Sequence, residues 1–251
     1  MKTLQSLAPL AFLAITALSA PAPISAEGPA FPITDIIGTG LSIEEYAAEL
    51  DGSNSHVRSL GKRQYGGDTY NQLTDGTPCR EITLIYARGT TQAGNVGAAD
   101  TEGPTFFNAL ASRLGGTSRL AIQGVTYPAN VAGFLAGGDA AGITTTYNLI
   151  NQAASRCPSA KIVLSRYSQG AQLIHTAAQR LSSATAARIN AVVVFGDPDR
   201  DETFGAVSTS KILIICHTCD NICDNGIIIT PEHRNYEIDA PTAASFVAAR
   251  V

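Results

Sequence analysis

Apolar residues along this chain form short continuous runs and longer periodic stretches, which predict alternating strands and helices. The short runs, rich in β-branched residues, are typical of strands buried on both faces. These strands are expected at Ile82–Tyr86, Leu120–Val125, Lys161–Ser165, Ala191–Phe195 and Ile212–Ile215. The stretches with apolar positions three or four residues apart predict helices. These helices are expected at Pro104–Leu114, Ala141–Ser155, Gln169–Leu181 and Pro241–Ala249. The alternation predicts an α/β fold, a three-layer α/β/α sandwich around a mainly parallel five-stranded sheet.

The N-terminus has the pattern of a secretory signal peptide. Lys2 is followed by an apolar run from Leu7 to Leu18 and then by small residues. The run is too short to span a membrane. We therefore expect residues 1–19 to be removed, and the protein to be secreted and extracellular without stable membrane insertion.

A dibasic pair, Lys62-Arg63, lies in a polar stretch rich in small residues. We interpret residues 20–63 as a pro-segment with little structure of its own, and a solvated surface pair is the alternative reading of Lys62-Arg63. Cleavage after Arg63 would leave a catalytic domain of residues 64–251, which is long enough for one well-buried core.

Charge and composition narrow the class of protein. The net charge is −4 and only 15% of residues are charged, whereas a nucleic-acid-binding surface would be basic and clustered. We expect a monomer with no nucleic-acid partner and with no metal or organic cofactor.

Five cysteines in a secreted chain indicate disulfides with one cysteine left over. They are Cys79, Cys157, Cys216, Cys219 and Cys223. Cys79 precedes the first predicted strand and Cys157 precedes the strand before Ser168. Neighbouring parallel strands would bring these two together.

Cys216 and Cys223 bracket a short loop, and their pairing would leave Cys219 unpaired. The alternative is a metal site in which His217 joins these three thiols. An oxidising compartment and the irregular spacing argue against that site.

The stretch Arg166-Tyr-Ser-Gln-Gly170 places a serine between a predicted strand and a predicted helix. This is the context of a nucleophile elbow, in which the turn exposes the serine hydroxyl. The backbone N–H of Gln169 would lie at the helix start and stabilise a developing oxyanion. Ser168 is the candidate nucleophile.

A serine nucleophile needs a histidine base, and four histidines are available. His56 lies in the expected pro-segment, His175 lies well inside the helix after Ser168, and His217 lies in the cysteine-rich loop, before Asp220 and Asp224. In this fold class the base follows the nucleophile and the acid. Elimination leaves His233.

The acid lies between Ser168 and His233 in the same order. The candidates are Asp197, Asp199, Asp220 and Asp224. Asp220 is favoured, because a small disulfide loop would hold it rigidly. The loop after the first strand would supply the second oxyanion donor, and Thr90 can offer its backbone N–H and its hydroxyl.

The chain resembles the cutinases, a family of small secreted serine esterases of fungi, over essentially all of residues 79–251. The matching pieces are Tyr86–Thr91 with Gly94 and Asn95, Tyr167–Gly170, Cys216–Thr218 with Asp220 and Cys223, and finally Pro231 and His233. The resemblance implies Ser168, Asp220 and His233 as a triad, and Thr90 and Gln169 as the oxyanion hole. It implies the disulfides Cys79–Cys157 and Cys216–Cys223.

The same resemblance implies an α/β-hydrolase fold without a large lid and the hydrolysis of cutin-type aliphatic polyesters or small esters. Loops at Val131–Leu135 and Ile227–Ile229 would be apolar rims for such a substrate, with ordinary core packing as the alternative. An acetylxylan esterase with the same triad is the second enzyme reading.

Two positions depart from the family pattern, since Arg166 and Cys219 stand where cutinases have glycine. A buried Arg166 would carry an unpaired charge next to the elbow, so we expect a route to solvent or a distorted elbow. Glu232 and the polar residues 234–237 are further departures. A catalytically impaired protein of the same fold therefore stays open as a third reading.

Overall fold

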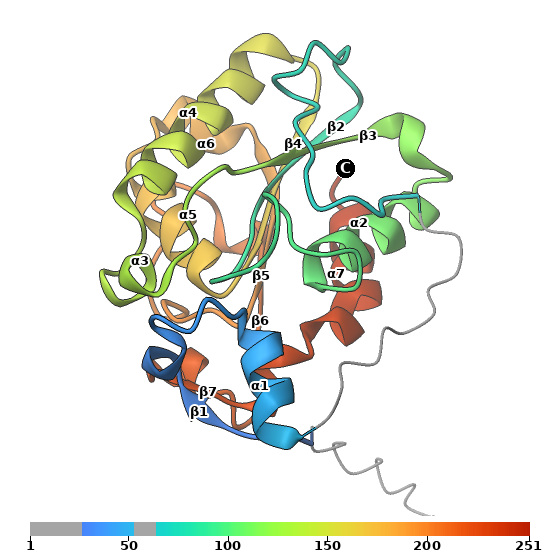
Figure 1. Ribbon diagram of the computed structural model, residues 1–251. Coiled ribbons are helices and arrows are strands. Elements are labelled where there is room, and N and C mark those ends of the chain that lie inside the picture. The colour runs from blue at the N-terminus through green and yellow to red at the C-terminus, as the bar shows by residue number, and fades with distance from the viewer. Residues whose placement is uncertain (1–26, 53–63) are drawn as a thin grey trace, which may run out of the picture.

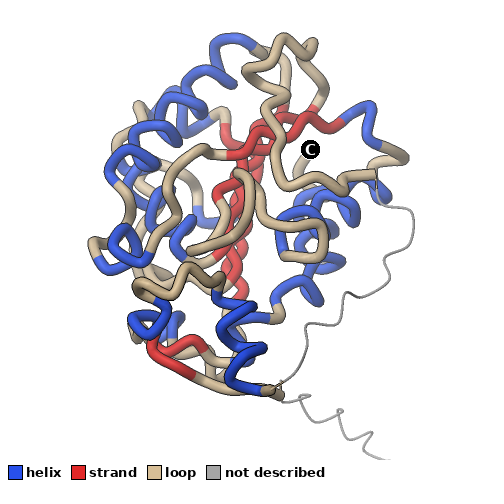
Figure 2. The backbone as a smooth tube through the Cα atoms, viewed as in Figure 1, coloured by secondary structure: helices blue, strands red, loops and turns tan. Residues whose placement is uncertain are grey.

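A computed structural model describes residues 27–52 and 64–251 (Figure 1). The expected signal peptide, His56 and the Lys62-Arg63 pair lie outside the described residues. Within them the predicted α/β architecture is confirmed: strands form the middle layer, and helices cover both of its faces (Figure 2).

The central sheet has five strands in the order β3-β2-β4-β5-β6, and every neighbouring pair is parallel. The strands are β2 (Ile82–Ala87), β3 (Leu120–Gly124), β4 (Lys161–Tyr167), β5 (Ile189–Phe195) and β6 (Ile212–Ile215). Each coincides with a predicted apolar run, because a parallel sheet covered on both faces buries all side chains of a strand. The carboxyl ends of β2, β4, β5 and β6 therefore meet at one edge.

Helices pack on the two faces of this sheet and enclose two apolar clusters. One face carries α4 (Ala140–Arg156), α5 (Gln169–Gln179) and α6 (Ser183–Ala187), and the other carries α2 (Glu102–Arg113) and α7 (Ala240–Ala248) (Figure 1). The short α6 was not predicted, because it is a single turn that depends on the Ser182 N-cap. The described residues also contain six 3-10 helices: Ile33–Ile36, Thr117–Arg119, Thr209–Lys211, Ile222–Asp224, Pro231–Arg234 and Tyr236–Asp239.

Both expected disulfides are present. Cys79 and Cys157 are bonded beside the paired strands β2 and β4, with their Cα atoms 5.6 Å apart. Cys216 and Cys223 close the loop after β6, and Cys219 is free and exposed. The alternative metal site is not formed, because two of its thiols are joined in this disulfide.

The expectation of little structure in residues 20–63 is wrong for residues 27–52. β1 (Phe31–Pro32) pairs antiparallel with β7 (Ile228–Ile229), and α1 (Ile43–Asp51) follows it. The sequence Ser42-x-x-Glu45 forms a capping box at the start of α1. The apolar side chains of the segment pack on the domain, so their burial stabilises the segment.

Candidate active site

The nucleophile elbow is a sharp turn between β4 and α5. Ser168 has φ 52° and ψ −125°, a strained conformation for a residue with a side chain. The turn is held by the Ser168 N–H, which donates to the Phe195 carbonyl at 3.0 Å. Gly170 must lack a side chain here, because a Cβ would lie 2.3 Å from the Ala87 carbonyl oxygen. The strand–turn–helix pattern of the sequence thus produces the predicted elbow.

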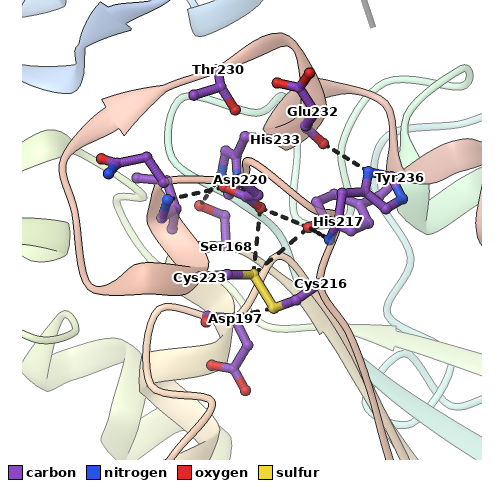
Figure 3. Close-up of polar contacts among 12 residues, drawn as sticks. Ser168, Asp197, Cys216, His217, Asp220, Cys223, Thr230, Glu232, His233 and Tyr236 are labelled. Atoms are coloured by element: carbon purple, nitrogen blue, oxygen red, sulfur yellow. Dashed lines mark hydrogen bonds and ion pairs between the residues drawn. A yellow bond between two sulfur atoms is a disulfide. The ribbon is translucent and has the colours of Figure 1, made fainter. Parts of the chain in front are cut away.

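Ser168, His233 and Asp220 are joined by two hydrogen bonds (Figure 3). The Ser168 Oγ lies 2.9 Å from His233 Nε2, and His233 Nδ1 lies 2.8 Å from Asp220 Oδ2. All three residues are buried. Because a carboxylate only accepts, Nδ1 carries the ring hydrogen and Nε2 is left to accept the serine proton. The Tyr167 hydroxyl also donates to the His233 carbonyl at 2.7 Å, which fixes the backbone of His233.

Asp220 is the acid candidate that the structure brings to His233. Its Oδ1 accepts from the Ile222 N–H at 2.9 Å and its Oδ2 from the Tyr236 hydroxyl at 2.6 Å. Burial acts to raise the pKa of Asp220, but the hydrogen bonds and charge of His233, Tyr236 and Ile222 outweigh it and hold that pKa below its ordinary value. Asp220 is therefore a stable carboxylate in the site.

The loop after β2 passes directly beside Ser168. A Cβ at Gly89 would lie 2.6 Å from the Tyr167 ring and 3.4 Å from the Ser168 Cβ. The adjacent Thr90 is buried, and its hydroxyl has no hydrogen-bond partner among the described residues. Gln169 is the first residue of α5, so its N–H has no acceptor within the helix. Both predicted oxyanion donors thus border Ser168.

Two residues that the sequence did not suggest hold this loop. The Gln92 side chain accepts from the Gly89 N–H at 2.9 Å and donates to Glu102 at 2.8 Å. Burial raises the pKa of Glu102 to about 8. No motif marks either residue, since the contact forms only when α2 packs next to the loop.

Comparisons with known proteins agree with this geometry. A family model described as cutinase matches residues 78–251. The chain belongs to the cutinase family. Cutinase CUT2 of Pyricularia oryzae is 45% identical and covers 84% of this chain and 99% of its own length.

Solved structures of esterases have a similar fold. A Trichoderma reesei cutinase in complex with a C11Y4 phosphonate inhibitor is 38% identical with a TM-score of 0.70, covering 87% of this chain and 91% of its own. An acetylxylan esterase is 25% identical with a TM-score of 0.56, covering 69% and 99%. The chain is accordingly a serine carboxylester hydrolase with a cutinase fold.

The side chain of Arg166 neither reaches solvent nor distorts the elbow, the two outcomes expected from the sequence. Its side chain is fully buried, yet β4 pairs regularly with β5 from Val163 to Tyr167 and the elbow is intact. The guanidinium carbon lies 5.6 Å from the ring centroid of Phe204. Burial holds the pKa of Arg166 well below its ordinary value, although the charge of Asp197 acts the other way. The side chain fits because it extends into the space beside Phe204 rather than into the elbow.

The other described histidines and acid candidates do not join the hydrogen-bonded path of Ser168, His233 and Asp220. His175 Nε2 lies 3.0 Å from Asp197 Oδ2, and both side chains are fully buried. The Asp197 Oδ1 accepts from the Asp199 N–H at 3.0 Å. Asp224 forms a partly exposed ion pair with Arg200. His217 stacks on the ring of Tyr236, whose hydroxyl donates to Asp220.

Ser168 is not open to solvent as the resemblance implied, since its exposed fraction is 1%. Residues 27–52 lie over the expected rims. Their apolar residues form one cluster with the rims, made of Phe31, Ile33, Ile36, Ile43, Ala47, Val131, Phe134, Ile222 and Ile229. The rims are the short helix α3 (Val131–Leu135) and the strand β7 rather than loops. Figure 1 shows the blue N-terminal segment beside β7.

Polar contacts hold this cover, residues 27–52, in place at two points. The Ile43 N–H donates to the Thr91 hydroxyl at 3.0 Å, and Arg234 donates to the Pro29 carbonyl at 3.1 Å. A cavity of ≈ 510 Å³ remains between α1 and the loop of Thr91. The cover is thus apolar over the rims and loosely packed beside the oxyanion loop.

Two further observations concern the described residues alone. Within residues 27–52 and 64–251, no group of three or more His, Cys, Asp or Glu side chains is arranged to hold a metal ion. No helix in this part of the chain combines the length and the apolar character needed to cross a membrane.

Proposed function

We propose that this chain hydrolyses cutin-type aliphatic polyesters with Ser168, His233 and Asp220 as the catalytic triad. The observation that carries the proposal is the continuous hydrogen-bonded path from the Ser168 Oγ through His233 to Asp220. Such a path is what converts a weak hydroxyl nucleophile into an effective one.

The proposed reaction has two halves. The Ser168 Oγ attacks the ester carbonyl while His233 Nε2 takes its proton, and the N–H groups of Thr90 and Gln169 bind the developing oxyanion. His233 then returns the proton to the leaving alcohol, which gives an acyl-enzyme. Water attacks the acyl-enzyme with His233 again as base, and Ser168 leaves with the proton. Asp220 orients the imidazole and stabilises its charged form throughout.

The substrate class follows from the rims and the relatives. Val131, Phe134 and Ile229 pack against residues 27–52, and without that segment they would form an apolar surface next to the site that suits an aliphatic acyl chain. The relative at 45% identity is named a cutinase. Acetylxylan esterase activity is the second candidate, supported by the solved esterase of that name at 25% identity.

Hydrolysis assays test both candidates. We expect the protein, with its cover removed, to hydrolyse p-nitrophenyl butyrate faster than the acetate and to release hydroxy fatty acids from cutin. Ser168→Ala should abolish this activity. Ser165→Ala is the matched control. Ser165 is buried like Ser168, but it lies within β4 and its hydroxyl has no hydrogen-bond partner among the described residues. Release of acetate from acetylated xylan without release from cutin would favour the second candidate.

We also infer that residues 1–19 direct secretion and that residues 20–63 are a pro-segment that closes the active site until it is removed. Two observations support this role: Ser168 is 1% exposed, and residues 27–52 pack on the rims at Val131, Phe134 and Ile229. The new N-terminus at Gln64 would stay attached, because its N–H and that of Tyr65 both donate to Asn108 Oδ1.

A further inference from the structure

Asp220 has a hydrogen-bond donor that the triad does not account for. Its Oδ2, the oxygen that accepts from His233, also accepts from the Tyr236 hydroxyl at 2.6 Å (Figure 3). The Tyr236 side chain is fully buried and comes from the 3-10 helix that follows His233. A short hydrogen bond to a charged oxygen is stronger than one between neutral groups.

The direction of this hydrogen bond is fixed by a second contact. The backbone N–H of His217 donates to the Tyr236 oxygen at 2.8 Å. A phenol has one proton, and the lone pair that accepts from His217 leaves that proton for Asp220. Tyr236 is therefore held as a donor to the carboxylate.

The ring of Tyr236 is supported from one face by the His217 side chain. The two rings are stacked, with centroids 4.0 Å apart and an interplanar angle of 17°. His217 Nε2 lies 2.6 Å from Asp239 Oδ2, and Nδ1 lies 2.9 Å from the Glu232 carbonyl oxygen. Both partners only accept, so both ring nitrogens carry hydrogen and His217 is a cation in this arrangement.

We propose that Tyr236 is a positioning residue that fixes the carboxylate of Asp220, and that the His217–Asp239 pair holds Tyr236 in place. The inference rests on the proposed role of Asp220 as the triad acid. The second donor prevents rotation of the carboxylate away from His233 and stabilises its ionised form. Small displacements in a catalytic constellation reduce rate strongly, which gives such a residue its effect.

The groups that face Asp220 define the expected pH behaviour. They are His233, Tyr236 and Tyr167, together with the Cys216–Cys223 disulfide, whose Cys223 Sγ lies 3.5 Å from Asp220 Oδ2 and does not titrate. The hydrogen bond from Tyr236 is one of the causes that lower the pKa of Asp220. Its removal raises that pKa, so the carboxylate is protonated at a higher pH.

The test compares Tyr236→Phe with the parent enzyme freed of its cover. We expect kcat for p-nitrophenyl butyrate to fall about tenfold with KM nearly unchanged. The acid limb of the kcat/KM profile should move to higher pH. Tyr65→Phe is the matched control, because its buried hydroxyl donates to the Leu120 carbonyl at 2.9 Å, outside the site. An unchanged kcat and acid limb in a folded Tyr236→Phe protein would overturn the proposal.

Asp239→Asn provides a second measurement, which also decides the matter should Tyr236→Phe not fold. This change keeps the shape of the side chain but weakens its pairing with His217. We therefore expect kcat to fall several-fold, as it should in Tyr236→Phe. No loss would overturn the role of the pair. Ser168→Ala distinguishes failure of the proposed triad from failure of the positioning role. If Ser168→Ala stays active, the proposed triad is wrong. If Ser168→Ala is inactive and Tyr236→Phe has normal activity, only the positioning role of Tyr236 is wrong.

Discussion

The guanidinium of Arg166 lies over the ring of Phe204, and none of its three nitrogens has a hydrogen-bond partner among the described residues. A cation–π contact offsets only part of the free energy of burying this charge. Arg166→Met should therefore raise the free energy of unfolding by about 1–3 kcal/mol, since Met fills similar space without a charge. Urea denaturation measures the difference.

Arg188→Met serves as the control for this prediction, because Arg188 donates to two carbonyl oxygens on the surface of the same layer. That change should be neutral or destabilising. A loss of stability in Arg166→Met would mean that Asp197 compensates the buried charge fully.

Cys219 has φ 72° immediately before Asp220, the proposed triad acid, in the left-handed region that favours glycine. Cys219→Gly should raise the free energy of unfolding by about 1 kcal/mol by relieving this strain. Cys219→Ala is the control, because it removes the thiol but keeps the Cβ. Equal stability of the two variants would show that the backbone conformation carries no strain.

Glu102 makes stability depend on pH. Burial raises its pKa from 4.5 to about 8, so in this range the folded protein holds a proton that the unfolded chain releases. The free energy of unfolding therefore falls as pH rises from about 4.5 to 8.

Glu102→Gln should remove that fall. Relative to the parent, the variant should gain at least about 1.4 kcal/mol between pH 4.5 and 8, the equivalent of one pKa unit. Glu81→Gln, at an exposed ion pair with Arg119, should give no such gain. Parallel stability profiles for Glu102→Gln and the parent would show that Glu102 is ionised when buried.

Removal of the cover tests the pro-segment. Protein that begins at Gln64 should hydrolyse p-nitrophenyl butyrate at least tenfold faster than protein that retains residues 27–52, because Ser168 is 1% exposed and the proposed closure attributes this burial to the segment that packs on the rims. Ile43→Asp, which places a charge in the apolar contact with the rims, should activate the uncut protein in the same direction. Equal rates with and without the segment would contradict the proposed closure.

The sequence predicted those parts of the fold that depend on local pattern. The five central strands are continuous apolar runs, and Ser168 is the residue between one of them and a helix. His233 followed from chain order, and Asp220 from the rigidity that a small disulfide loop provides. Each of these inferences uses neighbours in sequence or the order of elements along the chain.

What could not be predicted depends on contacts between distant segments. Residues 27–52 have an amphipathic pattern, but only the rims of the folded domain give it a surface to cover. Tyr236 lies in a polar stretch of sequence with no periodicity that marks it as buried. Arg166 contradicts the rule that charges stay in water, because its position in β4 forces the side chain into the core.

The most direct test of the central claim is labelling with an active-site phosphonate. Protein freed of its cover is treated with an alkyl phosphonate ester, and the modified peptide is identified by mass spectrometry. Attack by an activated hydroxyl predicts one equivalent of phosphonate on Ser168, and a loss of labelling in His233→Ala. Labelling at another residue, or no labelling of the folded protein, would contradict the assignment of Ser168 as the nucleophile.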